Sequence, residues 1–241
     1  MAIETVQIGP FRIADLSYRD CLCKLVEMAG TGQRLAYALH IGGLTLDDDD
    51  EYAQATEDAD IHYADGIAVV NLARRAGAVN IERSPTTDLA PDLLRLLPEG
   101  TRIGLIGGPP GLAKLAGLRL EEEFGVQVVF ALHGYGEAQP DVLQSLPTAA
   151  VVFVGLGAPL EMKWVQQNRA ILPPALIVTC GGWFGFVLGR ETRAPRFVQA
   201  IGGEWAWRLA HSPGRLGRRY LLGARKYLTY RKANPRNDLA R

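Results

Sequence analysis

The sequence has few of the features that mark membrane-spanning, secreted or nucleic-acid-binding proteins. No apolar stretch among its 241 residues reaches the roughly 18 residues that a membrane span needs. The N-terminus does not show a basic segment followed by an apolar one, so we expect a protein that stays in the cytosol. The 26 basic residues equal the 26 acidic ones, which argues against a chain-wide electrostatic grip on nucleic acid.

Cysteine and histidine are also scarce. The three cysteines, Cys21, Cys23 and Cys180, cannot form a disulfide framework. The four histidines have no ligand-like spacing to them, so we expect no zinc site.

Common nucleotide-binding and hydrolase motifs are missing or incomplete. There is no GxxxxGK[ST] loop and no GxSxG elbow, which argues against a P-loop NTPase and an α/β-hydrolase. The nearest dinucleotide fingerprint is Gly155-x-Gly157-x-x-Leu160, which lacks the third glycine. An NAD-dependent oxidoreductase therefore stays open only as an alternative.

What the sequence does contain is a regular alternation of strand-like and helix-like segments over 34–202. Apolar segments typical of strands occupy 34–41, 61–70 (interrupted by Ala64-Asp65-Gly66), 101–106, 126–131, 149–154 and 176–179. Helical periodicity follows several of them, as at 112–124. Such strand–turn–helix units predict an α/β domain over 1–203, a Rossmann-like parallel sheet with helices on both faces.

Glycines gather where the predicted strands end. Gly107 and Gly108 follow one strand, and Gly155 and Gly157 follow another. In such sheets ligands bind beyond the carboxyl ends of the strands, where helix N-termini attract anions. We therefore expect this edge to hold a diphosphate, although tight strand–helix packing explains the same glycines.

The neutral total hides an asymmetry between the two ends of the chain. Residues 204–241 carry ten basic and two acidic residues, a net charge of +8, which leaves −8 on residues 1–203. A helix predicted over 213–232 has Leu216, Tyr220 and Tyr227 on one side and basic residues on the other. This amphipathic appendage suits an anionic membrane surface; the alternative is a helix folded onto the core.

Several short blocks occur in the order found in one enzyme family. They are Ala64-Asp65-Gly66, Glu82-Arg83 with Asp88-Leu89, Ile106-Gly107-Gly108, Gly134-Tyr135, Val154–Pro159 with Trp164, Arg193-Ala194-Pro195, and Glu204-Trp205 through Arg219-Tyr220-Leu221. On these blocks the chain from Asp60 to about Tyr220 resembles the WecG/TagA/CpsF glycosyltransferases (glycosyltransferase family 26).

The resemblance implies an inverting transfer of a sugar, N-acetylmannosamine or a related hexose, from a UDP-sugar donor. The acceptor would be a sugar on a polyprenyl diphosphate lipid, in cell-wall or exopolysaccharide assembly. No metal or other cofactor is implied. The protein would lie on the inner face of the cell membrane, and a homo-oligomer is left open.

The resemblance also assigns roles to residues. Asp65 would be the general base that removes the proton of the acceptor hydroxyl; the alternative is a turn-forming aspartate. Arg83 would face the active-site cleft, and Asp88 would hold a sugar hydroxyl unless it only favours a helix dipole. Tyr135 stacks on uracil or packs in the core.

Other positions complete or alter the expected pocket. The glycine-loop amides of Gly107, Gly108, Gly155 and Gly157 would reach the UDP. Arg215, Arg218 and Arg219 would close over the cleft and neutralise the leaving UDP. His40 stands where the family has a sugar-binding asparagine.

Three departures leave room for another donor sugar. Glu161 replaces the usual glutamine, Met162 a glutamate, and Gly185 an acid. A non-catalytic, membrane-associated subunit that binds nucleotide sugars is therefore a second alternative. The acidic run Asp47–Asp50 resembles a D-x-D metal site, but it precedes a predicted helix, so we expect a solvated helix start.

Overall fold

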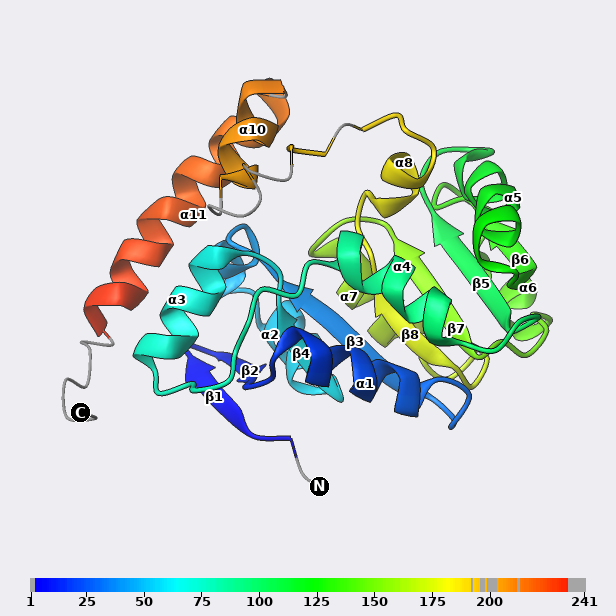
Figure 1. The fold of residues 1–241 in the computed structure, drawn as a ribbon, viewed down its shortest axis with the longest axis horizontal. Coiled ribbons are helices and arrows are strands. Elements are labelled where there is room, and N and C mark those ends of the chain that lie inside the picture. Colours follow the sequence, from blue (N-terminus) through cyan, green and yellow to red (C-terminus); the bar gives the residue numbers. More distant parts are fainter. Residues whose placement is uncertain (1–2, 192, 196–197, 199–202, 212, 234–241) are drawn as a thin grey trace.

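The computed structural model describes residues 3–191, 193–195, 198, 203–211 and 213–233. Its centre is a six-stranded parallel sheet in the order β4-β3-β8-β7-β5-β6 (Figure 1). The strands are β3 (Arg34–Leu39), β4 (Ile61–Ala64), β5 (Arg102–Gly107), β6 (Gln127–Leu132), β7 (Val151–Gly155) and β8 (Leu176–Thr179). Each lies within the predicted apolar segments or within two residues of them, so the predicted parallel α/β fold is confirmed.

Helices cover both faces of the sheet. The helices before the C-terminal region are α1 (Tyr18–Met28), the short 3₁₀ helix η1 (Gly43–Leu46), α2 (Asp50–Glu57), α3 (Ile67–Arg75), α4 (Thr86–Leu96), α5 (Leu112–Phe124), α6 (Pro140–Gln144), α7 (Leu160–Asn168) and α8 (Trp183–Val187). The sheet has one hydrophobic core on each face, and successive residues of β3 point into different ones. Leu35 and Tyr37 belong to the core with α2, α3 and α7, and Ala36 belongs to the core with α1, α4 and α5. This alternation of side chains along strands buries the sheet on both faces.

Close packing explains two of the glycines at the sheet edge. A Cβ on Gly107, whose φ is +137°, would lie 2.2 Å from the carbonyl oxygen of Gly155. A Cβ on Gly155 would lie 2.7 Å from the carbonyl oxygen of Gly181. The ends of β5, β7 and β8 therefore approach one another more closely than residues with a side chain allow.

A two-stranded hairpin precedes the sheet, and the sequence did not predict it. Strands β1 (Thr5–Ile8) and β2 (Phe11–Ala14) pair antiparallel. Ile8, Phe11 and Ile13 are fully buried and join the core that also holds α2 and α3. The hairpin therefore belongs to the α/β domain.

The C-terminal region forms α10 (Glu204–His211) and α11 (Pro213–Ala233), and α11 runs beside α3 (Figure 1). Its far end is tied to Asp47: Lys226 Nζ and the Tyr230 hydroxyl lie 2.5 Å from the two carboxylate oxygens of Asp47. Burial raises the pKa of Asp47, but these hydrogen bonds outweigh that effect and hold the pKa below its usual range.

Within the described residues, no helix is long and apolar enough to span a bilayer.

One expectation about the acidic run was wrong. Asp49 caps α2 through a hydrogen bond from the backbone N–H of Tyr52, and Asp50 and Glu51 lie in the first turn, as a helix start requires. Asp47 is different, because its side chain is only 16% exposed and binds the C-terminal helix. It is a docking residue rather than part of a solvated helix start.

Candidate active site

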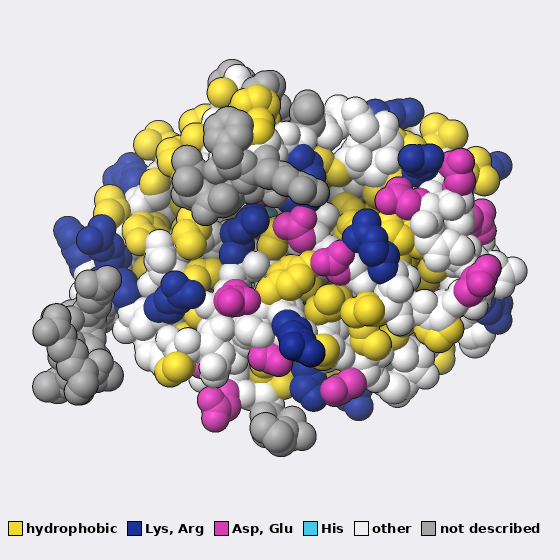
Figure 2. Space-filling view, viewed as in Figure 1, with side chains coloured by type: hydrophobic (Ala, Val, Ile, Leu, Met, Phe, Trp, Pro, Cys, Tyr) yellow, Lys and Arg dark blue, Asp and Glu magenta, His cyan; other side chains and the backbone are white. Residues whose placement is uncertain are grey.

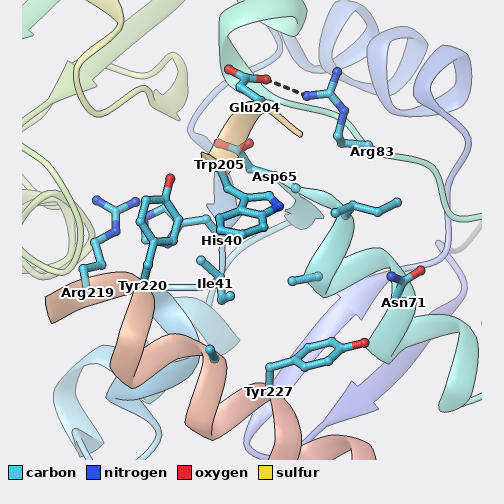
Figure 3. Close-up of a pocket in the computed structure, with 14 residues that line it drawn as sticks. His40, Ile41, Asp65, Asn71, Arg83, Glu204, Trp205, Arg219, Tyr220 and Tyr227 are labelled. Carbon is cyan, nitrogen blue, oxygen red and sulfur yellow. Dashed lines mark hydrogen bonds and ion pairs between the residues drawn. The ribbon is translucent and has the colours of Figure 1, made fainter. Parts of the chain in front are cut away.

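A cavity of about 330 Å³ lies between the carboxyl ends of β3 and β4 and the C-terminal helices (Figure 3). One end of its lining is polar, with His40, Asp65, Arg83 and Glu204. Most of the other side chains in the lining are apolar or aromatic, among them Ile41, Ile67, Trp205 and Tyr227, and Asn71 and Arg219 add two polar ones. We call this space the central cavity.

Asp65 reaches the central cavity because β4 ends one residue before it. Its backbone N–H donates to the carbonyl oxygen of Leu39, 2.8 Å away, which extends the pairing of β3 and β4. Gly66 then turns the chain with a φ of +121°, and α3 begins at Ile67. The Asp65 side chain is half-buried, and in Figure 3 it lies beneath the Glu204–Arg83 pair and near His40.

Arg83 lies between two acidic side chains that come from different helices. Its Nη1 is 3.0 Å from Glu204 Oε2, and its Nη2 is 3.9 Å from Asp88 Oδ2. Asp88, in the first turn of α4, also holds Arg193 Nη1 at 2.5 Å. The chain of charges therefore connects α10, Arg83, α4 and Arg193.

Asp88 does not line the central cavity. It lines a neighbouring polar cavity of about 510 Å³, to which Arg83 also contributes. A sugar hydroxyl bound by Asp88 would therefore lie in this neighbouring cavity and not in the central one. The role predicted for Asp88 stays a prediction.

The imidazole ring of His40 is held by the turn that follows β3. Its Nδ1 accepts a hydrogen bond from the backbone N–H of Gly43, 3.0 Å away. The neutral imidazole must then carry its proton on Nε2, since Nδ1 is an acceptor. His40 lines the central cavity.

The predicted glycine loops lie along the same sheet edge but do not line the central cavity. Gly108 donates its N–H to the carbonyl oxygen of Gly155, 3.1 Å away, so this amide is already engaged. Gly157 has a φ of +81°, and a Cβ there would meet nothing within 4 Å. Of the four glycines, Gly157 thus has the most open surroundings, but its N–H already donates to Glu161 Oε2, 3.0 Å away.

Two further predicted residues also lie outside the central cavity. Tyr135, in the loop after β6, is 73% exposed, so it does not pack in the core. Glu161, in the first turn of α7, is buried, and its carboxylate faces the backbone of the glycine loops.

The three predicted arginines of the C-terminal region differ in position. Arg219 lines the central cavity and lies against Gly42. Arg218 is exposed and is not part of that lining. The side chain of Arg215 lies outside the part of the structure that is described.

Sequence reasoning did not assign roles to several residues that line the central cavity. Glu204 pairs with Arg83, and the Trp205 and Tyr220 rings lie 6.3 Å apart at its edge. Glu204, Trp205 and Tyr220 are in the blocks that carry the family resemblance, which was the available signal. Their contacts depend on how α10 and α11 dock, and no local pattern reports that docking.

Among the residues that the structure describes, no group of three or more His, Cys, Asp or Glu side chains is placed to hold a metal ion. The polar end of the central cavity instead combines one carboxylate at a strand end with arginines from two directions.

A comparison with protein families identifies the family of the chain. The model of the family described as "Glycosyl transferase WecG/TagA/CpsF family" matches residues 6–236, nearly the whole chain and more than the blocks recognised in the sequence. The chain therefore belongs to the WecG/TagA/CpsF family of glycosyltransferases.

Proposed function

We propose that this glycosyltransferase moves a hexose, such as N-acetylmannosamine, from a UDP-sugar to a sugar hydroxyl on a polyprenyl diphosphate lipid, with inversion at the anomeric carbon. The observation that carries the proposal is the Asp65 carboxylate, which lies at the end of β4 in a cavity that Arg83 and Arg219 also line.

The proposed reaction is a single displacement. Asp65 accepts the proton of the acceptor hydroxyl while that oxygen attacks the anomeric carbon. The bond from the anomeric carbon to the diphosphate oxygen breaks, and UDP leaves with the bonding electrons. Arg83 and Arg219 offset the negative charge that develops on the diphosphate, so we expect transfer without an added divalent cation.

The apolar part of the central cavity supports a lipid-linked acceptor. Ile41, Ile67 and Tyr227 line the central cavity beside α3 and α11, together with Asn71 (Figure 3). Apolar side chains exclude water and favour contact with hydrocarbon. The first isoprene units would occupy this part and leave the sugar at the polar end.

A panel of UDP-sugars tests the proposal directly. We expect at least one UDP-sugar to release UDP only when a polyprenyl-diphosphate-linked sugar is present, and UDP but not NAD to raise the melting temperature. Transfer should persist in excess EDTA. Stabilisation by NAD alone would support the oxidoreductase alternative, and binding of UDP-sugars without any transfer would support the non-catalytic subunit.

We also propose that α11 attaches the protein to an anionic membrane on the cytosolic side. Arg218, Leu221, Arg225 and Leu228 follow one another at helical spacing and are all exposed, whereas Gly223 is buried on the inner side. Figure 2 shows basic and hydrophobic side chains interleaved along α11. Each basic residue near such a surface contributes about 1 kcal/mol.

A double substitution on this outer face tests membrane attachment. Leu221 and Leu228 are 65% and 51% exposed, so Leu221→Glu/Leu228→Glu should leave the fold unchanged. Insertion of each leucine contributes about 1.5 kcal/mol or more, so we expect sedimentation with phosphatidylglycerol-containing liposomes to weaken at least about 10-fold. Leu118→Glu, at a 58% exposed position of α5, is the control. Equal binding by both variants would exclude α11 as the anchor.

A further inference from the structure

The side chain of Arg219 lies against a residue that has no side chain. A Cβ on Gly42 would lie 2.6 Å from Nε of Arg219 and 3.0 Å from both its Cδ and its Cγ. These are the three nearest atoms around that position, and all of them belong to Arg219. Gly42 is buried, although it lies in the turn after β3. The side chain of Arg219 therefore occupies the space that a side chain at position 42 would fill.

The backbone of Gly42 does not itself require a glycine. Its φ of −70° and ψ of −30° lie in the right-handed helical region, which every residue with a side chain adopts easily. Gly66 differs, because its φ of +121° is a conformation that favours glycine. At position 42 the physical reason for a glycine is therefore the room that it leaves for Arg219.

The next residue, Gly43, has a separate task. A Cβ there would lie 2.7 Å from Cδ1 of Leu39 and 2.8 Å from the hydroxyl oxygen of Tyr52, and both of these side chains belong to the core. The N–H of Gly43 also donates to Nδ1 of His40. Gly43 thus packs the turn onto the core, whereas Gly42 presents the turn to α11.

The two arginines of the central cavity are held in different ways. Arg83 forms ion pairs with Glu204 and, at a longer distance, with Asp88. Over the described ranges of the chain, no hydrogen bond or ion pair fixes the guanidinium of Arg219. An arginine without such partners has many rotamers, and a ligand that binds it must order the side chain. The contact with Gly42 is what limits this freedom.

Arg219 also lies at a useful place in the cavity. Figure 3 shows Arg219 and Arg83 at opposite ends of the group of labelled side chains, with Asp65 and His40 between them in this view. Arg219 therefore brings a positive charge to the central cavity from the side opposite to Arg83, and no acid in the described structure neutralises it through an ion pair.

We propose that Gly42 is a positioning residue, whose missing side chain leaves a seat that holds the guanidinium of Arg219 at the central cavity, facing the diphosphate of the donor. This rests on the proposed function, in which Arg219 offsets the charge of that diphosphate. A guanidinium that is already in place binds phosphate oxygens with a smaller loss of side-chain entropy. Gly42 does not touch the donor and acts through Arg219.

The first test examines the seat without any ligand. Alanine suits the backbone of Gly42, so Gly42→Ala should melt within about 2 °C of the wild type. Crystal structures of the two proteins should show Arg219 against residue 42 in the wild type and displaced from it in the variant. An Arg219 side chain that occupies the same place in both structures would overturn the proposal.

The second test is a double-mutant cycle on the binding of UDP, measured by calorimetry. Arg219→Ala should weaken binding at least about 10-fold, the scale for loss of a hydrogen bond between charged groups, and Gly42→Ala at least about 5-fold. The double variant should bind UDP as Arg219→Ala does, because Gly42 acts only through Arg219. Uridine, which has no phosphate, should bind equally to all four proteins.

Gly217→Ala is the matched control, because a Cβ at this position of α11 would meet nothing within 4 Å, and it should bind UDP as the wild type does. A purely structural role of Gly42 would weaken UDP binding equally with and without Arg219, and that result would overturn the proposal. Displacement of Arg219 with unchanged UDP binding would overturn the positioning role. If the wild type binds no UDP, the proposed function and the positioning role both fail, while the crystal structures still decide whether the seat exists.

Discussion

Replacing Asp65 with asparagine is expected to reduce sugar transfer at least about 100-fold, the usual scale for loss of a general base. The amide has nearly the size of the carboxylate but cannot accept the proton of the acceptor hydroxyl. The backbone hydrogen bond from Asp65 to Leu39 does not involve the side chain, so β4 and its turn should remain intact. Initial rates of transfer to the lipid-linked acceptor at saturating donor measure the effect.

A measurement of UDP binding shows whether Asp65→Asn has lost only the catalytic step or the binding site as well. We expect Asp65→Asn to bind UDP within a few-fold of the wild type, because the arginines that we propose face the diphosphate are unchanged. Asp141→Asn, at an exposed position in the first turn of α6, serves as the control and should transfer normally. Undiminished transfer by Asp65→Asn would refute its role as the base.

The second large effect is expected from Gly223→Leu, which would push α11 away from the domain. A Cβ at this position would lie 2.7 Å from the carbonyl oxygen of Ile41 and 2.9 Å from its Cγ1. Ile41 lines the central cavity, as do Arg219 and Tyr227 of α11. Because small misplacements of positioning groups can reduce rates about 100-fold, we expect transfer to fall at least about 10-fold.

A matched control lies on the same helix. A Cβ on Gly217 would meet nothing within 4 Å, so Gly217→Leu changes helix propensity by the same amount without a clash. Hydrogen exchange over α11 should accelerate in Gly223→Leu and remain near the wild-type rate in Gly217→Leu. Equal activity and equal exchange in the two variants would show that docking of α11 does not shape the site.

The sheet could be predicted because its strands are apolar runs that end in glycine. The segment 176–179 is β8 itself, and 112–124 is α5. The hairpin of β1 and β2 was missed because its strands, with the sequences TVQI and FRIA, are not continuous apolar runs like the equally short β8, and because they take their stability from the core contacts of Ile8 and Phe11. Short strands have little periodicity of their own.

The candidate site could be predicted in part. Asp65, Arg83, His40 and Arg219 all line one cavity, and the roles that the family resemblance assigns to them stay predictions. The ion pair of Arg83 with Glu204 joins residues 121 positions apart, and no local pattern encodes such a contact. The same holds for Asp47, whose partner Tyr230 lies 183 positions along the chain.

A glycine at the end of a strand has two physical explanations, close packing and ligand binding. Gly107 and Gly155 permit close approach of strand ends, and that requirement exists with or without a ligand. The sequence alone therefore cannot separate packing from diphosphate binding at these positions. Glu161 illustrates the same limit, because its burial beneath the loops depends on the assembled sheet.

The most direct test is a crystal structure of Asp65→Asn with a UDP-sugar and an acceptor analogue. We expect the anomeric carbon to lie in the central cavity between the diphosphate and the acceptor hydroxyl, with that hydroxyl within hydrogen-bonding distance of residue 65 and Arg83 facing the diphosphate. A nucleotide bound away from this end of the sheet, or an acceptor hydroxyl out of reach of residue 65, would contradict the assignment.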